Sequence, residues 1–134
     1  MVDQLITFIL DQPTSADVSF ALGTTKLFKI SSSAVSSGGT PSWPRTVTSM
    51  ADGESLVTLK GVLYYFYNTS TAGDIGKYDL ASTFDDDYGS SVPTGAAALQ
   101  KAPHPVAKKE DIMLFGNGRY VGTFTKSTTT LAPT

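Results

Sequence analysis

The chain repeats one strand–turn–strand unit three times, and this recurrence limits the possible folds more than any other feature. Each copy has an apolar, aromatic-rich strand, a turn, and a second strand that ends on an apolar residue. The three copies span residues 20–30, 63–78 and 113–124. When their last apolar residues, Ile30, Tyr78 and Phe124, are aligned, the intervals are 48 and 46 residues. A self-similar period in the forties is typical of repeat architectures, so the sequence predicts an all-β fold of repeated antiparallel strand units.

A second marker follows the first two copies at the same phase. Ser-x-Pro tripeptides end at Pro44 and Pro93, 49 residues apart, and each follows a polar stretch. After Phe124 the same marker would fall near position 138, beyond the last residue of the 134-residue chain. We therefore expect a single repeat domain whose third repeat stops part-way. The expected units are about residues 5–50, 51–99 and 100–134.

Glycine-containing turns separate the expected strands. Lys60-Gly61 and Asn117-Gly118 each join two β-prone runs, and residues 23–25 do the same in the first copy. Glycine accepts the positive φ that tight hairpin turns require, and Asn-Gly is the preferred pair for a type I′ turn. The sequence thus predicts a hairpin at each of these three turns.

Three further patterns concern how the strands pack. Residues 62–67 are apolar at consecutive positions, which is typical of a strand covered on both faces. Gly76 and Gly122 both lie two residues before the last aromatic of their copy, and we expect close packing there against a neighbouring sheet. Prolines beside Trp43 and Val92 predict outer, edge-like strands that begin near these residues, after loop-like connections.

Composition excludes several classes of protein. Only 16% of the residues are charged and the net charge is −2, with no basic face to predict nucleic-acid binding. There are no cysteines, which excludes disulfides and thiolate zinc sites. No apolar run approaches the roughly 18 residues of a membrane-spanning helix, and Asp3 stands where a signal peptide needs positive charge. We expect no membrane segment and no cofactor.

The residues with chemical potential do not form a recognisable catalytic pattern. His104 is the only histidine, it lies between two prolines, and no Gly-x-Ser-x-Gly elbow accompanies it. The acidic run Asp85–Asp87 alternates oxygen ligands as calcium loops do, but Gly89 stands where a third ligand belongs and the next Glu is Glu110. We therefore predict a non-enzymatic protein in which this acidic run is a hydrated turn.

Four residues are candidates for a ligand or interface role: Trp43, Tyr88, His104 and Tyr120. Trp43 is the only tryptophan, and aromatic side chains can stack on sugars. The alternative is that Trp43 fills the seam between two sheets, because large aromatic side chains dominate packing energy. The aromatic run at residues 64–67 is expected to belong to the core.

The period and hairpin layout resemble the blade repeats of β-propeller proteins such as the kelch and WD-repeat classes, over roughly residues 5–124. The Trp-Asp dipeptide of WD repeats and the double glycine of kelch repeats are absent. The Asn-Gly turn followed by Tyr120-Val-Gly-Thr-Phe124 also looks like propeller-like proteins of bacteriophage particles. The resemblance implies an open or partial propeller-like array, because three blades are too few to close a ring of four to eight.

An open array leaves an apolar face at each end, and such faces mark interfaces. The sequence therefore favours a structural or interaction module of a virion or other extracellular assembly, which is oligomeric or docks on a larger partner. Its working faces would lie near residues 5–10 and 113–134, and its partners would be other proteins or copies of itself. The alternative is a carbohydrate-binding, lectin-like propeller, and an enzyme comes third.

Overall fold

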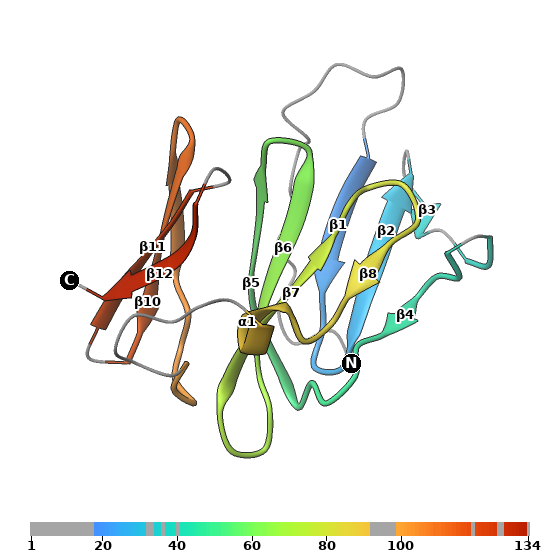
Figure 1. The fold of residues 1–134 in the computed structure, drawn as a ribbon. Coiled ribbons are helices and arrows are strands. Elements are labelled where there is room, and N and C mark those ends of the chain that lie inside the picture. The colour runs from blue at the N-terminus through green and yellow to red at the C-terminus, as the bar shows by residue number, and fades with distance from the viewer. Residues whose placement is uncertain are drawn as a thin grey trace.

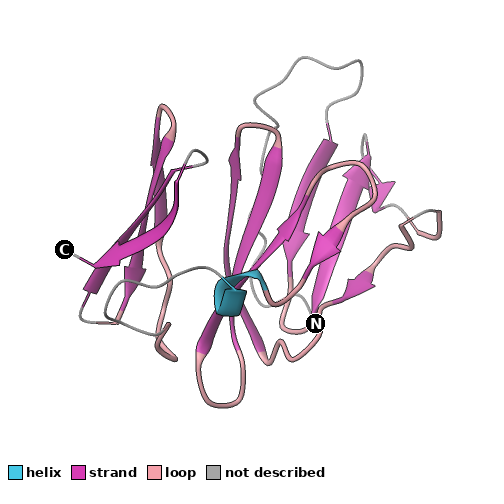
Figure 2. Ribbon diagram, viewed as in Figure 1, coloured by secondary structure: helices cyan, strands magenta, loops and turns pink. Residues whose placement is uncertain are grey.

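The computed structural model describes residues 18–31, 34–35, 37–39, 41–91, 99–118, 120–125 and 128–133. These residues form three antiparallel four-stranded sheets, and the only helix among them is the single turn α1 (Tyr88–Ser91) (Figures 1 and 2). The first sheet consists of β1 (Val18–Leu22), β2 (Lys26–Ser31), β3 (Ala34–Val35) and β4 (Arg45–Thr46). The second consists of β5 (Asp52–Leu59), β6 (Val62–Asn68), β7 (Gly73–Tyr78) and β8 (Phe84–Asp85). The third consists of β9 (Val106–Lys109), β10 (Ile112–Asn117), β11 (Tyr120–Thr125) and β12 (Thr128–Pro133).

The three sheets follow one another in chain order and face one another, with the second sheet between the other two (Figure 1). Strand β5 contacts β1 on one side and β9 on the other. The prediction of an all-β fold with antiparallel sheets is confirmed. Within the described residues, no helix is long and apolar enough to span a membrane.

The three aligned residues of the repeat occupy matching places. Each lies in the last two residues of the second strand of a hairpin, opposite the beginning of the first strand. The cross-strand pairs are Ile30 with Ser19, Tyr78 with Leu63, and Phe124 with Met113. The hairpins predicted around residues 23–25 and around Lys60-Gly61 are present, and both Lys60 and Gly61 have positive φ.

The second sheet is buried on both faces, as its uninterrupted apolar strand predicted. Alternate side chains of β6 enter two different cores: Tyr64 and Phe66 pack toward the third sheet, whereas Leu63, Tyr65 and Tyr67 pack toward the first. Each of these five side chains is at most 3% exposed. Because side chains alternate along a strand, both sides of β6 face a core, which accounts for its run of apolar and aromatic residues.

The matched glycines have a different role from the predicted one. Gly76 lies opposite Tyr65, and Gly122 lies opposite Phe115, each on the adjacent strand of the same sheet. A Cβ atom at either glycine would overlap the ring of its cross-strand partner. The prediction of close packing against a neighbouring sheet is therefore wrong, because the glycine makes room for an aromatic ring of its own sheet.

The third hairpin turns one residue later than predicted. Asn117 is still paired in the ladder, opposite Tyr120, and the positive φ of 63° lies at Gly118. Residue 119 lies outside the described residues. The Oδ1 atom of Asn117 accepts a hydrogen bond from the backbone N–H of Gln100 at 2.7 Å. This bond gives Asn117 a structural role inside the strand.

The outer strands also differ in part from the prediction. Strand β4 begins two residues after Trp43, as expected, but the fourth strand of the second sheet is β8, within the stretch predicted as a connection. The predicted start at Val92 lies outside the described residues. The third sheet has four strands, because residues 128–133 pair with β11. That the third repeat stops part-way stays a prediction.

Candidate interaction face

The third sheet has one apolar face that no other described element covers. Side chains of β10 alternate between buried and exposed positions: Met113 and Phe115 point toward the second sheet and are 0% and 3% exposed. Ile112 and Leu114 point the other way and are 45% and 41% exposed. The period-2 alternation of a strand thus divides four consecutive apolar residues between a core and an open surface.

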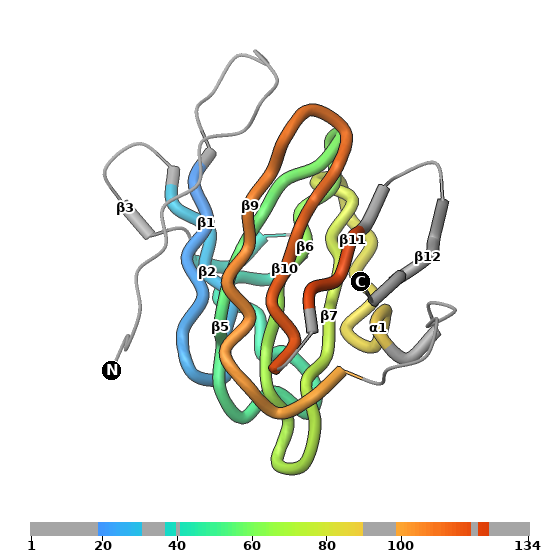
Figure 3. Tube along the Cα trace, turned by 90° about the vertical axis from the view of Figure 1, so that its left-hand side faces the viewer, coloured from blue at the N-terminus to red at the C-terminus, as the bar shows by residue number. Residues whose placement is uncertain are grey.

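Strands β9 and β11 extend this surface on both sides of β10. Val121 lies opposite Gly116 in the ladder and is 47% exposed. We define the outward face of the third sheet as the side chains that share this side by register: Ala107, Lys109, Ile112, Leu114, Val121 and Thr123. In Figure 3, which views the molecule from this side, β9 and β10 lie in front of the second sheet.

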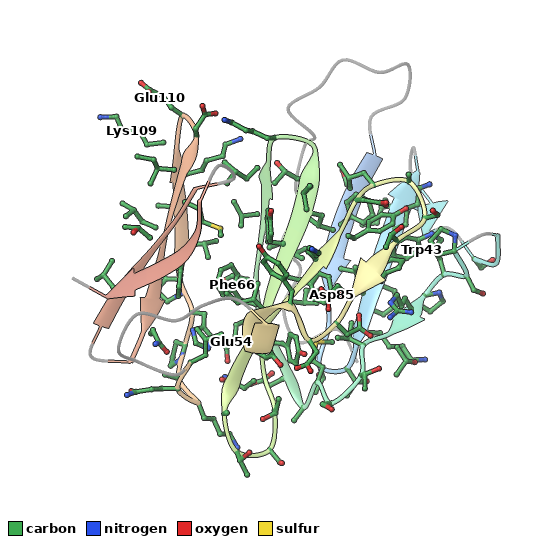
Figure 4. The ribbon with its side chains drawn as sticks, in the orientation of Figure 1. Trp43, Glu54, Phe66, Asp85, Lys109 and Glu110 are labelled. Atoms are coloured by element: carbon green, nitrogen blue, oxygen red, sulfur yellow. The ribbon has the colours of Figure 1, made fainter. Side chains whose placement is uncertain are left out.

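Charges lie at the rim of this face and not at its centre. Lys109 and Glu110 are at the tip of the β9–β10 hairpin (Figure 4). Beside them, the Nζ atom of Lys60 lies 2.8 Å from Asp111 Oδ2, which links the turns of the second and third sheets. The pair is solvent-exposed, so it adds about 0–1 kcal/mol to stability. The face itself is neutral apart from Lys109.

Trp43 lies in the seam between the first and second sheets, where the packing alternative placed it. It is 6% exposed, and its ring centroid lies 5.7 Å from Phe20, 5.8 Å from Tyr78 and 5.8 Å from Phe84. The indole therefore joins both sheets and is not available to stack on a sugar in this conformation.

Tyr88 and His104 are both buried at the core between the second and third sheets. Tyr88, on α1, is 8% exposed, and Lys77 Nζ lies 4.2 Å from the centre of its ring. His104 is 1% exposed and sits between Phe66 and Gly73, with Nδ1 2.9 Å from the carbonyl oxygen of Gly116. Its Nε2 has no hydrogen-bond partner among the described residues. This environment gives His104 a packing role between the second and third sheets.

The fourth candidate, Tyr120, begins β11, and its backbone pairs with Asn117. Its side chain lies outside the described residues. The structure brings Tyr88 and His104 to the same core but places Trp43 on the opposite side of the second sheet. The four residues therefore do not form one site.

The acidic run is not a hydrated turn at its central residue. The side chain of Asp86 is 8% exposed, and its Oδ2 accepts hydrogen bonds from Arg45 at 2.5 Å and from the backbone N–H of Thr48 at 3.1 Å. Its Oδ1 accepts the Tyr65 hydroxyl at 2.6 Å, and its backbone carbonyl accepts the Tyr67 hydroxyl. The predicted solvation is wrong because two tyrosines buried in the second sheet need acceptors for their hydroxyl groups.

A second buried carboxyl lies near the same turn. Burial raises the pKa of Asp74 to about 6; the backbone N–H of Ile75 opposes this shift, and a hydrogen bond with Asp87 adds to it. A raised folded pKa means that the protonated form favours folding. The contribution is therefore complete below the ordinary value of 3.8 and is lost as the pH rises through about 6.

This shift predicts the behaviour of Asp74→Asn, which is uncharged but keeps an acceptor for the Ile75 N–H. We expect the variant to be more stable than the wild type at about pH 7.5, by on the order of 1 kcal/mol, and the difference to shrink toward about pH 4. Urea unfolding at several pH values measures both proteins. A stability difference that does not change with pH would contradict the assignment.

No group of three or more metal-binding side chains is present in the part of the chain that the structure describes. Comparisons of the chain with protein-family models, curated proteins and solved structures found no match. The outward face of the third sheet is the candidate site, because the exposed large hydrophobic side chains of the described residues lie on it. The sequence predicted two working faces, near residues 5–10 and near 113–134, and the first of these lies outside the described residues. In the second, the alternation in residues 112–115 is the signal that divides buried from exposed side chains.

Proposed function

We propose that this protein is a non-enzymatic structural or interaction module that docks on a protein partner through the outward face of its third sheet. One observation carries the proposal: Ile112, Leu114 and Val121 are the large hydrophobic side chains exposed among the described residues, and all three lie on this face. Single exposed apolar residues are ordinary on protein surfaces, whereas apolar residues grouped on one face indicate an interface.

The energetics favour covering this face. Complete burial of a Leu, Ile or Val side chain is worth about 1.5–3 kcal/mol, so covering three half-exposed ones contributes several kcal/mol to association. The sheet presents these side chains on a regular ladder whose inner side is fixed by Met113 and Phe115. A preformed face loses little conformational entropy when a partner covers it.

The other candidate functions have weaker support. The carbohydrate-binding proposal relied on Trp43, and an enzyme would rely on His104; both side chains are buried among other residues. The propeller-like character of the array, and a place in a virion or other extracellular assembly, remain proposals that rest on the repeat and on the resemblance.

The proposal predicts how an apolar fluorescent dye, bis-ANS, binds to the protein. At a concentration at which the wild type sediments as a monomer, we expect clear fluorescence enhancement. The triple variant Ile112→Thr, Leu114→Thr, Val121→Thr should lose most of it, because threonine keeps the strand propensity and removes the apolar surface. Thr71→Ala, in an exposed loop, is the matched control. Equal dye binding by the triple variant and the wild type would refute the proposal.

A further inference from the structure

The outward face of the third sheet corresponds, by the internal repeat, to a face that is buried elsewhere in the same chain. The pairs Leu63–Tyr78 and Met113–Phe124 align the second and third sheets. In this alignment the exposed residues of the third sheet match residues of the second sheet that pack against the third. The matches are Ile112 with Val62, Leu114 with Tyr64, and Val121 with Ile75.

The first sheet obeys the same correspondence. The pair Ser19–Ile30 aligns with Leu63–Tyr78, which matches Phe20 with Tyr64, Leu22 with Phe66, and Leu27 with Ile75. Phe20, Leu22 and Leu27 pack against the second sheet, just as their counterparts pack against the third. The first sheet therefore packs on the second in the same way as the second packs on the third. In both cases one side of a sheet contacts the opposite side of the next sheet.

The outward face of the third sheet has the equivalent residues and could pack on a further sheet in the same way. The described residues contain no further sheet that could cover it. The receiving side of the first sheet is the side opposite Phe20 and Leu22. By register it carries Ala21, Phe28 and Ile30; Phe28 and Ile30 are half-buried, and the small Ala21 side chain is 2% exposed. These residues correspond to Tyr65, Gly76 and Tyr78, which receive the first sheet inside the chain.

We propose that two copies of this chain associate head to tail, with the outward face of the third sheet of one copy packed on the receiving side of the first sheet of the other. This inference rests on the proposed docking function of that face. Two copies contribute six sheets, which is within the four to eight of closed rings, and each copy supplies one face of each kind to the two interfaces. The interface is heterologous, so the two faces can be disabled separately.

Sedimentation velocity and native mass spectrometry on two single variants test this arrangement. Leu114→Asp disables the outward face of the third sheet, and Ile30→Asp disables the receiving side of the first. We expect the wild type to dimerise and each variant alone to self-associate at least about tenfold more weakly. An equimolar mixture should recover a heterodimer, because one interface then contains two intact faces. Thr71→Asp should behave as the wild type.

Three results would overturn the inference. One is a wild type that stays monomeric at every concentration reached. Another is an Ile30→Asp protein that dimerises as the wild type does, because the third sheets would then pair with each other. The last is a mixture that associates no better than either variant alone. In each case the dye-binding result decides the docking proposal independently. Circular dichroism verifies that the variants fold, and Leu114→Thr with Ile30→Thr replaces them if they do not.

Discussion

Replacement of Gly76 by alanine should destabilise the protein by about 3 kcal/mol or more. A Cβ atom at this position would overlap the ring of Tyr65, which is 0% exposed and cannot move into solvent. Displacing the ring would also break the 2.6 Å hydrogen bond from the Tyr65 hydroxyl to Asp86. A loss of stability at this position would be informative, because replacing glycine by alanine in a strand interior normally stabilises a protein by roughly 0.5–1 kcal/mol.

A double-mutant cycle measured by urea unfolding isolates this contact. In a Tyr65→Ala background the ring is absent, so Gly76→Ala should cost little or should stabilise. Lys77→Ala, on the same strand but half-exposed, is the control for substitution in β7. If Gly76→Ala costs the same with and without the Tyr65 ring, the cross-strand packing is not the cause of the destabilisation.

Removal of the Asp86 carboxylate should cost a similar amount, about 3 kcal/mol. Asp86→Ala leaves the Tyr65 hydroxyl without its acceptor and the partly buried Arg45 guanidinium without its counter-charge. The adjacent Asp85→Ala is a matched control, because Asp85 is 39% exposed and lies 3.8 Å from Lys77, a pair worth about 0–1 kcal/mol. Thermal or urea unfolding compares the two variants. Equal losses from Asp85→Ala and Asp86→Ala would contradict the role of the network.

The same network predicts a dependence on pH. Burial acts to raise the pKa of Asp86, but the hydrogen bonds from Arg45, Tyr65 and Thr48 outweigh it and hold the pKa below the ordinary value of 3.8. A depressed folded pKa gives stability that is present above the unfolded pKa and lost as the pH falls through the folded pKa. We therefore expect the difference between the wild type and Asp86→Ala to narrow in acid below about pH 4.

The parts of the fold that sequence could predict are those that depend on local patterns. The alignment of Ile30, Tyr78 and Phe124 places equivalent hairpin positions together, because the interval between repeats is a property of the chain itself. The apolar run at residues 62–67 predicts a strand that is buried on both faces, because no polar residue interrupts it. Strand periodicity is readable without knowing which strands are neighbours.

The features that sequence did not predict depend on contacts between distant residues. Asp86 is 41 residues from Arg45 and 21 from Tyr65, so nothing local distinguishes it from the exposed Asp85. Gly76 and Gly122 were correctly matched, but the ring that each accommodates lies on the adjacent strand and is identified only by register. Asn117 lies in the strand and not in the predicted turn, and its side chain accepts a hydrogen bond from Gln100. The local Asn-Gly pattern gives no sign of this bond.

A proton NOE measurement of which aromatic rings meet across the sheets tests most directly whether the three sheets pack on one another. The second sheet should contact both neighbours: Phe66 meets Phe115, with centroids 5.1 Å apart, and Tyr78 meets Phe20, with centroids 6.0 Å apart. We predict both inter-sheet NOEs together with those of the hairpin ladders. Intact hairpin NOEs without one of these ring contacts would show that the sheets form but do not stack, and would contradict the packing of the second sheet between the other two.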